Sequence, residues 1–513
     1  MSFVSISFLV FFAAVLLIYY LVPKRIQWGV LLLASLGFYL AGGVQAALFI
    51  VGTTVLVYFG GRQMQRVRDA ADGMKAAKKK NRGVLLFELL ANFGVLLILK
   101  YYNFAAENIE SLFGLFHWDI NAPLVNMILP LGISFYTFQA IGYTIDVYKG
   151  KIRAEKNFFR FALFISFFPQ VTQGPISRYD QLAPQLEAEH KASLQNLAFG
   201  AQLMLWGYFK KLVIADRAGI AVSQIFDGGA DASGAVTLLG MALYAVQIYT
   251  DFSGGIDMTR GAAQMMGIDL IENFRQPYFG TSVADYWRRW HMSLTNWMRD
   301  YVFFPLTLSH FSNRIGKWGR RRFRNIGKQF PAYLPTFVTF LLIGIWHGAG
   351  WGFIAYGLYN SLIIIASMAL TPAFTSWKNA LHINDHSFGW RVFCIVRTFL
   401  IMVFGKTLTR AASVSDAFSM MKKAVTFAGS SGEAHGLAAI GLSGREVLVL
   451  AIAIALLFTV SVLREKAIPV RESLAAKPLP LRYAAYLGLL AIVLIFGVYG
   501  EGYSASSFVY RNY

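Results

Sequence analysis

The sequence has few charged residues and almost no cysteine. Asp, Glu, Lys and Arg make up 14% of its 513 residues, whereas Ala, Val, Ile, Leu, Met, Phe, Trp, Tyr and Cys make up 56%. A soluble protein of this length would need a far more charged surface, so the composition predicts a polytopic membrane protein that forms one integral domain over residues 1–513. The single cysteine, Cys394, excludes an intramolecular disulfide bond and a metal cluster held by several cysteines.

Common site motifs are also missing. The sequence contains no Walker or glycine-rich nucleotide loop, no Gly-x-Ser-x-Gly motif and no pair of carboxylates within an apolar segment. Its histidines do not have the spacing of metal ligands, since His291 and His347 lie far apart in the sequence and neither has a ligand four residues on. We therefore expect no metal.

Acidic residues are scarcer than basic ones, with 27 Asp and Glu against 47 Lys and Arg, and the formal net charge is +20. Such a charge can indicate nucleic-acid binding, but the basic residues cluster in short loops between apolar segments, where the preference of cytoplasmic loops for positive charge explains them. We expect no nucleic-acid partner. The loops at 24–25, 62–82 and 149–156 are expected in the cytoplasm and the N-terminus outside it.

Apolar segments separate these loops. The first lies near residues 3–22, and because no basic residue precedes Lys24, it is expected to be a retained span rather than a cleaved signal peptide. Further spans are expected near residues 28–41, 44–60, 84–99, 124–148, 196–222, 236–250, 388–405, 445–462 and 482–499.

Residues 331–370 contain no Asp, Glu, Lys or Arg and have one titratable imidazole, His347. As one helix they would be about 60 Å long, roughly twice the hydrocarbon core of a bilayer, so the helix must break. We place the break at 347–352, where three glycines lower helix propensity and permit unusual backbone angles. An ionisable residue on irregular backbone at membrane depth is a candidate functional residue, with structural packing as the alternative.

Residues 282–301 show the pattern of an amphipathic helix. Ser282 and Asp285 have the spacing of a capping box, and aromatic residues then recur on one helical face opposite arginines. This pattern predicts one helix that lies in the membrane interface. Arg288 and Arg289 would face either the phosphates of a cofactor or lipid headgroups.

Other polar residues interrupt the apolar segments. Gln139 follows a Pro-Gly start at 129–132, and Pro169 with Gly174-Pro175 excludes a continuous helix over 167–182. These two segments predict either a cavity wall or a kinked helix. Asp251, close to two glycines, predicts a helix end that faces water or a cavity.

Three segments together resemble the membrane-bound O-acyltransferase (MBOAT) family: LPLGISFYTFQAIGYTIDVYKG (129–150), ENFRQPYFGTSVADYWRRWHMSLTNWMRDYVFFPL (272–306) and IWHGAGW (345–351). The resemblance is nearest to the bacterial alginate and peptidoglycan O-acetyltransferase branch. It implies an all-α fold of about 10–12 transmembrane helices, with re-entrant and interfacial helices, in a ring around a thin centre that a tunnel crosses.

The resemblance also implies residue roles. His347 matches the catalytic histidine of the family, and His291 matches the histidine of its donor-side motif. We further expect these donor-side or tunnel residues: Asn273, Trp287, Arg288, Arg289, Trp290, Trp346, Gln139 and Asp251. A neutral imidazole is suited to take a hydroxyl proton near pH 7, which acyl transfer to a hydroxyl requires.

The implied activity is an O-acyltransferase, and specifically an O-acetyltransferase, of the bacterial plasma membrane. It would take an acyl group from cytosolic acetyl-CoA, or from another thioester, and pass it outward for O-acetylation of a cell-surface polysaccharide or peptidoglycan. An extracytoplasmic SGNH-hydrolase-like protein is the implied partner, and residues 500–513 are a candidate contact for it. The alternatives are D-alanyl or other acyl transfer to teichoic acid, lipid or protein, and a membrane transporter.

Overall fold

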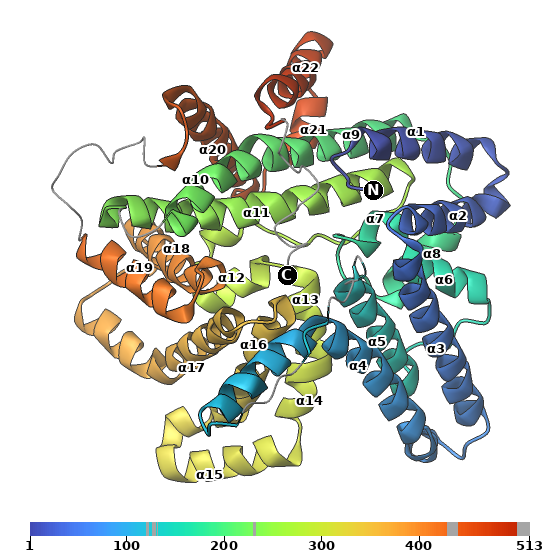
Figure 1. Cartoon of the computed structure of the whole chain (residues 1–513), viewed down its shortest axis with the longest axis horizontal. Coiled ribbons are helices and arrows are strands. Elements are labelled where there is room, and N and C mark those ends of the chain that lie inside the picture. Colours follow the sequence, from blue (N-terminus) through green and yellow to red (C-terminus); the bar gives the residue numbers. More distant parts are fainter. Residues whose placement is uncertain (119–122, 126–129, 131, 229–231, 428–439, 500–513) are drawn as a thin grey trace. The chain divides into compact units, whose positions relative to one another are not determined.

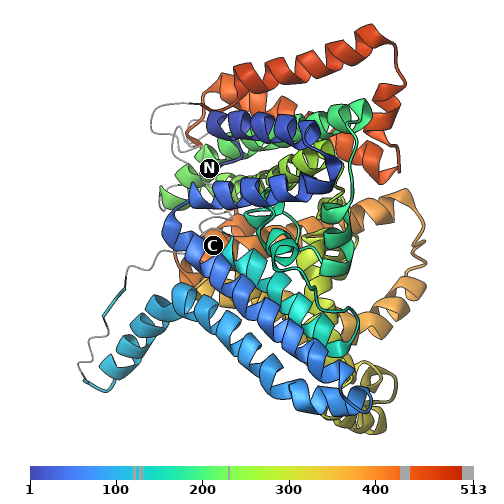
Figure 2. The same cartoon turned by 90° about the vertical axis from the view of Figure 1, so that its right-hand side faces the viewer.

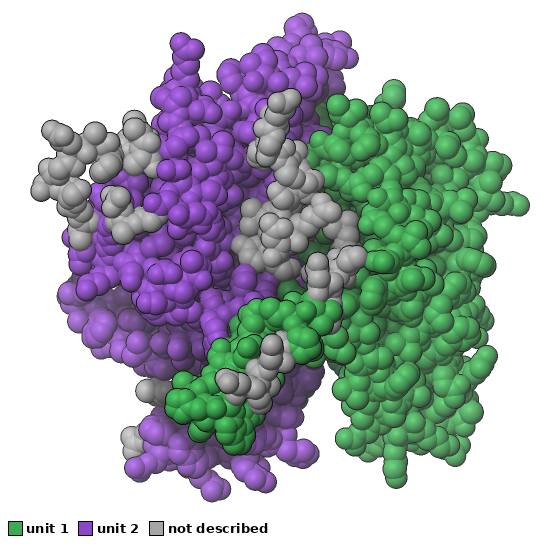
Figure 3. Space-filling model, viewed as in Figure 1, with its two compact units in different colours: residues 1–204, 255–271, 504–507 green, residues 205–254, 272–503, 508–513 purple. Residues whose placement is uncertain are grey.

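The computed structural model describes the chain except for residues 119–122, 126–129, 131, 229–231, 428–439 and 500–513. The described residues form helices joined by short loops and contain no β-strand, which confirms the predicted all-α class. The helices fall into two compact units, coloured separately in Figure 3. Unit 1 contains residues 1–204 and 255–271, and unit 2 contains residues 205–254 and 272–503. The expected partner contact at 500–513 lies outside the described residues.

Eight helices are long and apolar enough to cross a membrane, and the shorter apolar helix α1 accompanies them in the described part of the chain. The chain is therefore a multi-pass membrane protein. The helix α4 (Met74–Gly114) is 41 residues long and extends well beyond the predicted span at 84–99 on both sides. The expected segments at 388–405, 445–462 and 482–499 correspond to α18 (Phe388–Arg410), α20 (Gly444–Glu465) and α22 (Leu479–Phe496).

Unit 1 is built around α3, α4 and α5, which contact one another and lie side by side in Figures 1 and 2. Its helices are α1 (Ile6–Leu21), α2 (Gln27–Leu40), α3 (Val44–Asp69), α4 (Met74–Gly114), α5 (Ile133–Lys149), α6 (Phe158–Ser166), α7 (Phe168–Val171) and α8 (Tyr179–Glu187). The helices α9 (Leu194–Tyr208) and α11 (Gly234–Met265) contribute residues to both units.

The predicted interruption at 167–182 is confirmed, because the helix ends at Ser166, resumes over Phe168–Val171 and begins again only at Tyr179. The start of α5 packs against this interruption. Gly132 has a φ of +75°, and a Cβ added there would lie 1.9 Å from the carbonyl oxygen of Val171. Only glycine fits this position, since a side chain would meet both the strained backbone angle and the neighbouring carbonyl.

Unit 2 holds the remaining helices: α10 (Asp216–Asp227), α12 (Val283–Arg289), α13 (Met292–Met298), α14 (Phe304–Thr307), α15 (His310–Gly327), α16 (Phe330–His347), α17 (Trp351–Ala380), α18, α19 (Val414–Thr426), α20, α21 (Val470–Ala475) and α22. Two π-helical segments, η2 (Phe209–Ala215) and η4 (Arg299–Phe303), join some of them. Short 3₁₀ turns occur at η1 (Lys24–Ile26) in unit 1 and η3 (Pro277–Phe279) in unit 2.

The break predicted at 347–352 is confirmed, since α16 ends at His347 and α17 begins at Trp351. The two helices run antiparallel in direct contact: a Cβ on Gly344 would lie 2.4 Å from the Phe353 carbonyl oxygen, and one on Gly357 would lie 2.7 Å from the Phe340 carbonyl oxygen. Gly348 and Gly350 have extended backbones with φ of −172° and 177°. Gly344 and Gly357 therefore serve close helix packing, and the expectation that the break uses unusual backbone angles is wrong for Gly348 and Gly350.

We predict that Gly344→Ala and Gly357→Ala each destabilise the protein by about 1–3 kcal/mol, because the added methyl group meets backbone that cannot move aside cheaply. The matched control is Gly389→Ala on α18, where an added Cβ meets nothing within 4 Å. Thermal unfolding in detergent micelles checks this. Equal melting temperatures for Gly357→Ala, Gly389→Ala and the wild type would show that α16 and α17 do not pack as described.

Candidate active site

The predicted interfacial helix is interrupted at its middle, at His291. The structure has α12, then an extended Trp290, then His291 with a φ of 45°, then α13 and the π-helical η4. The expectation of one continuous helix over 282–301 is wrong. The break has a backbone cause, since the Met292 N–H donates to the Asn273 carbonyl at 3.0 Å and the Arg275 N–H donates to the Arg289 carbonyl at 2.9 Å.

The aromatic face of this segment does not meet lipid either. Trp287, Trp290 and Trp297 are 2%, 1% and 5% exposed, so they are buried in protein. The Trp287 indole N–H donates to Asn360 Oδ1 at 3.0 Å, which anchors α12 to α17. The predicted capping contact is present, because Ser282 Oγ accepts from the Asp285 N–H at 3.1 Å. The aromatic face thus packs against other helices of the same chain, and the expectation that it faces the membrane is wrong.

Asn273 holds His291 in place, and both residues are fully buried. Asn273 Oδ1 accepts the Ser293 N–H at 2.9 Å and lies 3.3 Å from His291 Nδ1. Because a backbone N–H can only donate, the Asn273 atom that it meets is the oxygen, and His291 Nδ1 must then carry the proton. Strained backbone at a buried histidine is a feature of functional sites, since the surrounding structure has to enforce it.

Trp346 connects the two candidate histidines. Its ring centroid lies 5.6 Å from that of His291 and 5.1 Å from that of His347. Phe252 on α11 packs edge-on against His291 at 4.8 Å, and Tyr356 on α17 lies 6.2 Å from His347. Residues 56 positions apart in the sequence therefore share one aromatic cluster of unit 2.

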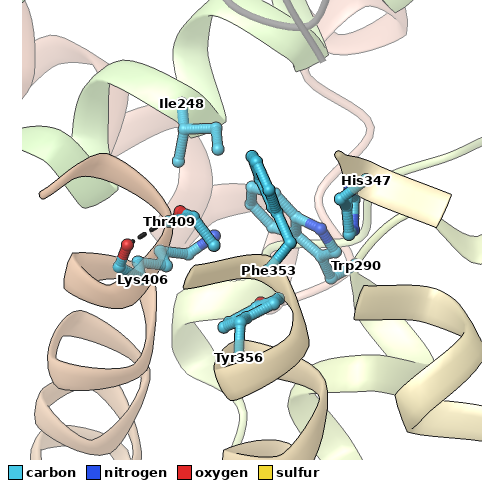
Figure 4. Close-up of a pocket in the computed structure, with 7 residues that line it drawn as sticks. All are labelled: Ile248, Trp290, His347, Phe353, Tyr356, Lys406 and Thr409. Carbon is cyan, nitrogen blue, oxygen red and sulfur yellow. Dashed lines mark hydrogen bonds between the residues drawn. The ribbon is translucent and has the colours of Figure 1, made fainter. Parts of the chain in front are cut away.

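His347 borders a small cavity within unit 2, shown in Figure 4. The cavity holds about 20 Å³, slightly more than one water molecule requires. It is lined by Ile248 of α11, Trp290, His347 of α16, Phe353 and Tyr356 of α17, and Lys406 and Thr409 of α18. His291 is not among these lining residues. His347 thus borders the cavity, whereas His291 is buried in the aromatic cluster and contacts Trp346.

Lys406 is the residue of this site that the sequence reasoning missed. It is 2% exposed, and its Nζ lies 3.8 Å from the ring centroid of Trp290 and 5.8 Å from that of Tyr286. Figure 4 shows its amine pointing across the cavity toward Trp290. A desolvated cation over a tryptophan face is stabilised by about 2 kcal/mol. The signal was a lone lysine at the end of an apolar run, which the predicted boundary at 405 left outside the span.

The arginines expected at the donor side are held in ion pairs. Arg288 lies 3.1 Å from Asp285, and its side chain is 67% exposed. Arg289 lies 3.3 Å from Asp285 and 2.7 Å from Glu465 of α20. Arg288 is thus the more accessible of the two, while Arg289 ties α12 to α20.

Asp251 does not lie at a helix end, so that expectation is wrong. It is 1% exposed in the interior of α11 and lies 2.6 Å from Lys211 Nζ, which also contacts Asp216 at 2.8 Å. The neighbouring Gly254 allows close packing, since an added Cβ would lie 2.9 Å from the Gly207 carbonyl. Gln139 is buried in α5 of unit 1, and its side-chain amide has no hydrogen-bond partner among the described residues.

Burial lowers the pKa of His291 from 6.5 to about 3, because the apolar surroundings penalise its charged form. His291 is therefore neutral at physiological pH, with the proton on Nδ1. No group of three or more His, Cys, Asp or Glu side chains placed to hold a metal ion occurs in the described part of the chain.

The fold and site define a multi-pass helical membrane protein that places the His347 imidazole at the wall of an internal cavity. The chain belongs to the membrane-bound O-acyltransferase family, whose sequence model matches residues 152–318. It is an acyltransferase, as the three motifs predicted, and this membership favours acyl transfer over the alternative of a transporter.

Named relatives cover much of the chain. It is 33% identical to the "Probable alginate O-acetylase AlgI" of Pseudomonas aeruginosa over 83% of its own length and 75% of the relative. It is 31% identical to a "Peptidoglycan O-acetyltransferase" of Helicobacter pylori over 67% of its length and 64% of that protein. A "Teichoic acid D-alanyltransferase" of Bacillus subtilis is 30% identical over 56% of this chain and 70% of the relative.

We predict that the low pKa of His291 makes the protein sensitive to mild acid. In the unfolded chain His291 binds a proton below about pH 6.5, whereas in the folded protein it does so only near pH 3. Its contribution to the free energy of unfolding is therefore complete above pH 6.5 and is lost as the pH falls toward 3. Between pH 8 and pH 5, the free energy of unfolding of the wild type should fall by about 2 kcal/mol more than that of His291→Gln. Thermal unfolding of both proteins at several pH values checks this, and parallel pH curves would contradict it.

Proposed function

We propose that the chain is an O-acetyltransferase of the bacterial plasma membrane in which His347 is the general base. The observation that carries this proposal is the position of His347 at the wall of the cavity, between aromatic side chains and beside a buried lysine. The similarity to alginate and peptidoglycan O-acetylating proteins supports the acetyl group and a polysaccharide acceptor.

In this mechanism His347 takes the proton of an acceptor hydroxyl while the hydroxyl oxygen attacks the carbonyl carbon of a thioester. The C–O bond forms, the C–S bond breaks, and His347 returns the proton to the departing thiolate. Proton transfer of this kind contributes a factor of about 10²–10⁴ to the rate, and holding the two reactants together next to His347 contributes much of the rest. Trp346, Phe353 and Tyr356 would exclude water from the thioester.

His291 has a positioning role in this proposal. Its ring contacts Trp346, which in turn contacts His347, so its fixed orientation sets the position of the indole beside the base. Its neutral state avoids a second positive charge next to His347, which would make the base harder to protonate. Asn273 fixes this arrangement because its Oδ1 accepts a hydrogen bond from His291 Nδ1.

We further propose cytosolic acetyl-CoA as the donor and an extracytoplasmic SGNH-hydrolase-like protein as the acyl-accepting partner. Arg288, the more exposed of the two donor-side arginines, is the candidate contact for the phosphates of the donor. The similarity to a D-alanyltransferase supports one other acyl group, D-alanine from a carrier-protein thioester. Offering the purified protein both labelled donors separates these candidates.

We predict that His347→Ala lowers kcat by about 10²–10⁴ and leaves the KM for acetyl-CoA within a few-fold of wild type, because the base acts in the chemical step. The protein is reconstituted in nanodiscs with acetyl-CoA labelled in the acetyl group, and the proposed SGNH-hydrolase-like partner, alginate fragments and peptidoglycan fragments serve as acceptors. The control is His386→Ala, which removes an exposed histidine outside the cavity. Equal transfer by His347→Ala and wild type would remove His347 from the mechanism.

A further inference from the structure

Lys406 is a buried cation for which the structure gives no anion. No carboxylate pairs with it, and its Nζ makes no hydrogen bond, among the residues that the structure describes. The other deeply buried lysines are different: Lys211 has two carboxylates, and Lys210 donates to Ser253 Oγ at 2.9 Å. Burying a charge without a partner is costly, and a residue in this position is a candidate functional group.

Lys406 borders both the aromatic side chain of Trp290 and the open space of the cavity. Lys406 lines the same cavity as His347, and its Nζ is seated on the face of Trp290. The aromatic face stabilises the charge from one side. Unlike a carboxylate, it does not offer oxygen atoms that accept hydrogen bonds from the ammonium group. An N–H group that does not point at the ring remains available to an oxygen that enters the cavity.

The backbone of Lys406 is part of a regular, closely packed helix. It lies within α18, where the Lys406 carbonyl accepts from Thr409 Oγ1 at 2.8 Å, a contact drawn in Figure 4. The helix α18 also packs closely against the start of α17, since a Cβ added to Gly352 would lie 2.2 Å from the Leu408 carbonyl oxygen. A donor carried on a closely packed helix suits a group that stabilises charge formed in a transition state.

We propose that Lys406 is a catalytic residue that stabilises the oxyanion formed on the acyl carbonyl during transfer. This inference rests on the proposed function. When the acceptor oxygen bonds to the carbonyl carbon, the electron pair of the C=O bond moves to oxygen, and Lys406 Nζ–H donates to that oxygen. As the C=O bond re-forms, the C–S bond breaks and the thiolate takes the proton held by His347. Lys406 itself gains and loses no covalent bond.

The test compares Lys406→Met, Lys406→Gln and Lys406→Arg in nanodiscs with labelled acetyl-CoA, measuring both acetyl transfer and release of the CoA thiol. We expect Lys406→Met to lower kcat by about 10²–10³ with the KM for acetyl-CoA within threefold of wild type. Lys406→Arg, which keeps the positive charge, should retain at least tenfold more activity than Lys406→Met. The matched control is Lys422→Met, which makes the same change at an exposed position of α19.

Stability separates a catalytic role from a structural one. Replacing an unpaired buried charge by an apolar side chain of similar length should leave the melting temperature of Lys406→Met equal to or above that of wild type. A kcat for Lys406→Met within threefold of wild type would overturn the inference, as would equal losses in Lys406→Met and Lys406→Arg or a loss confined to KM. If Lys406→Met does not fold, Lys406→Gln decides by the same criteria. If wild type transfers no acetyl or D-alanyl group, the proposed function fails and the role of Lys406 fails with it.

Discussion

The close antiparallel packing of α16 and α17 determines where His347, the proposed base, lies. Gly344 and Gly357 bring the two helices together, so that α16 must end at His347 and the chain must return within three residues. This places the His347 imidazole at the turn. Neither helix contains Asp, Glu, Arg or another His, and their one Lys, Lys378, lies near the far end of α17. The ring thereby meets the aromatic residues at the start of α17, and an internal cavity forms beside it.

The side chains around His347 differ in charge and in whether that charge is paired. His291 is neutral because it is fully buried, and Asn273 sets which of its nitrogens carries the proton. The acids of unit 2 near the site are already engaged: Asp285 and Glu465 pair with Arg289, and Asp251 pairs with Lys211. Lys406 is then the cation that faces the cavity beside His347, which suits a reaction whose transition state carries negative charge on oxygen.

Much of this could be predicted from the sequence where one residue type decides the outcome. An uncharged run too long for one span had to break, and its glycines and lone histidine showed where. Features that depend on distant contacts could not be predicted. The turn at His291 is held by backbone hydrogen bonds to Asn273 and Arg275, which lie earlier in the chain. The periodicity of 282–301 does not indicate these contacts. A glycine beside Asp251 suggested a helix end, but Gly254 serves the approach of another backbone, which only the folded chain reveals.

The location of the chemistry can be observed with an acetyl-CoA analogue in which a methylene group separates sulfur from the carbonyl, so that no transfer occurs. A cryo-electron microscopy structure of its complex with the protein in nanodiscs should place the carbonyl carbon in the cavity beside His347, with its oxygen about 3 Å from Lys406 Nζ. A complex with the carbonyl bound outside this cavity, out of reach of His347, would contradict the proposed site.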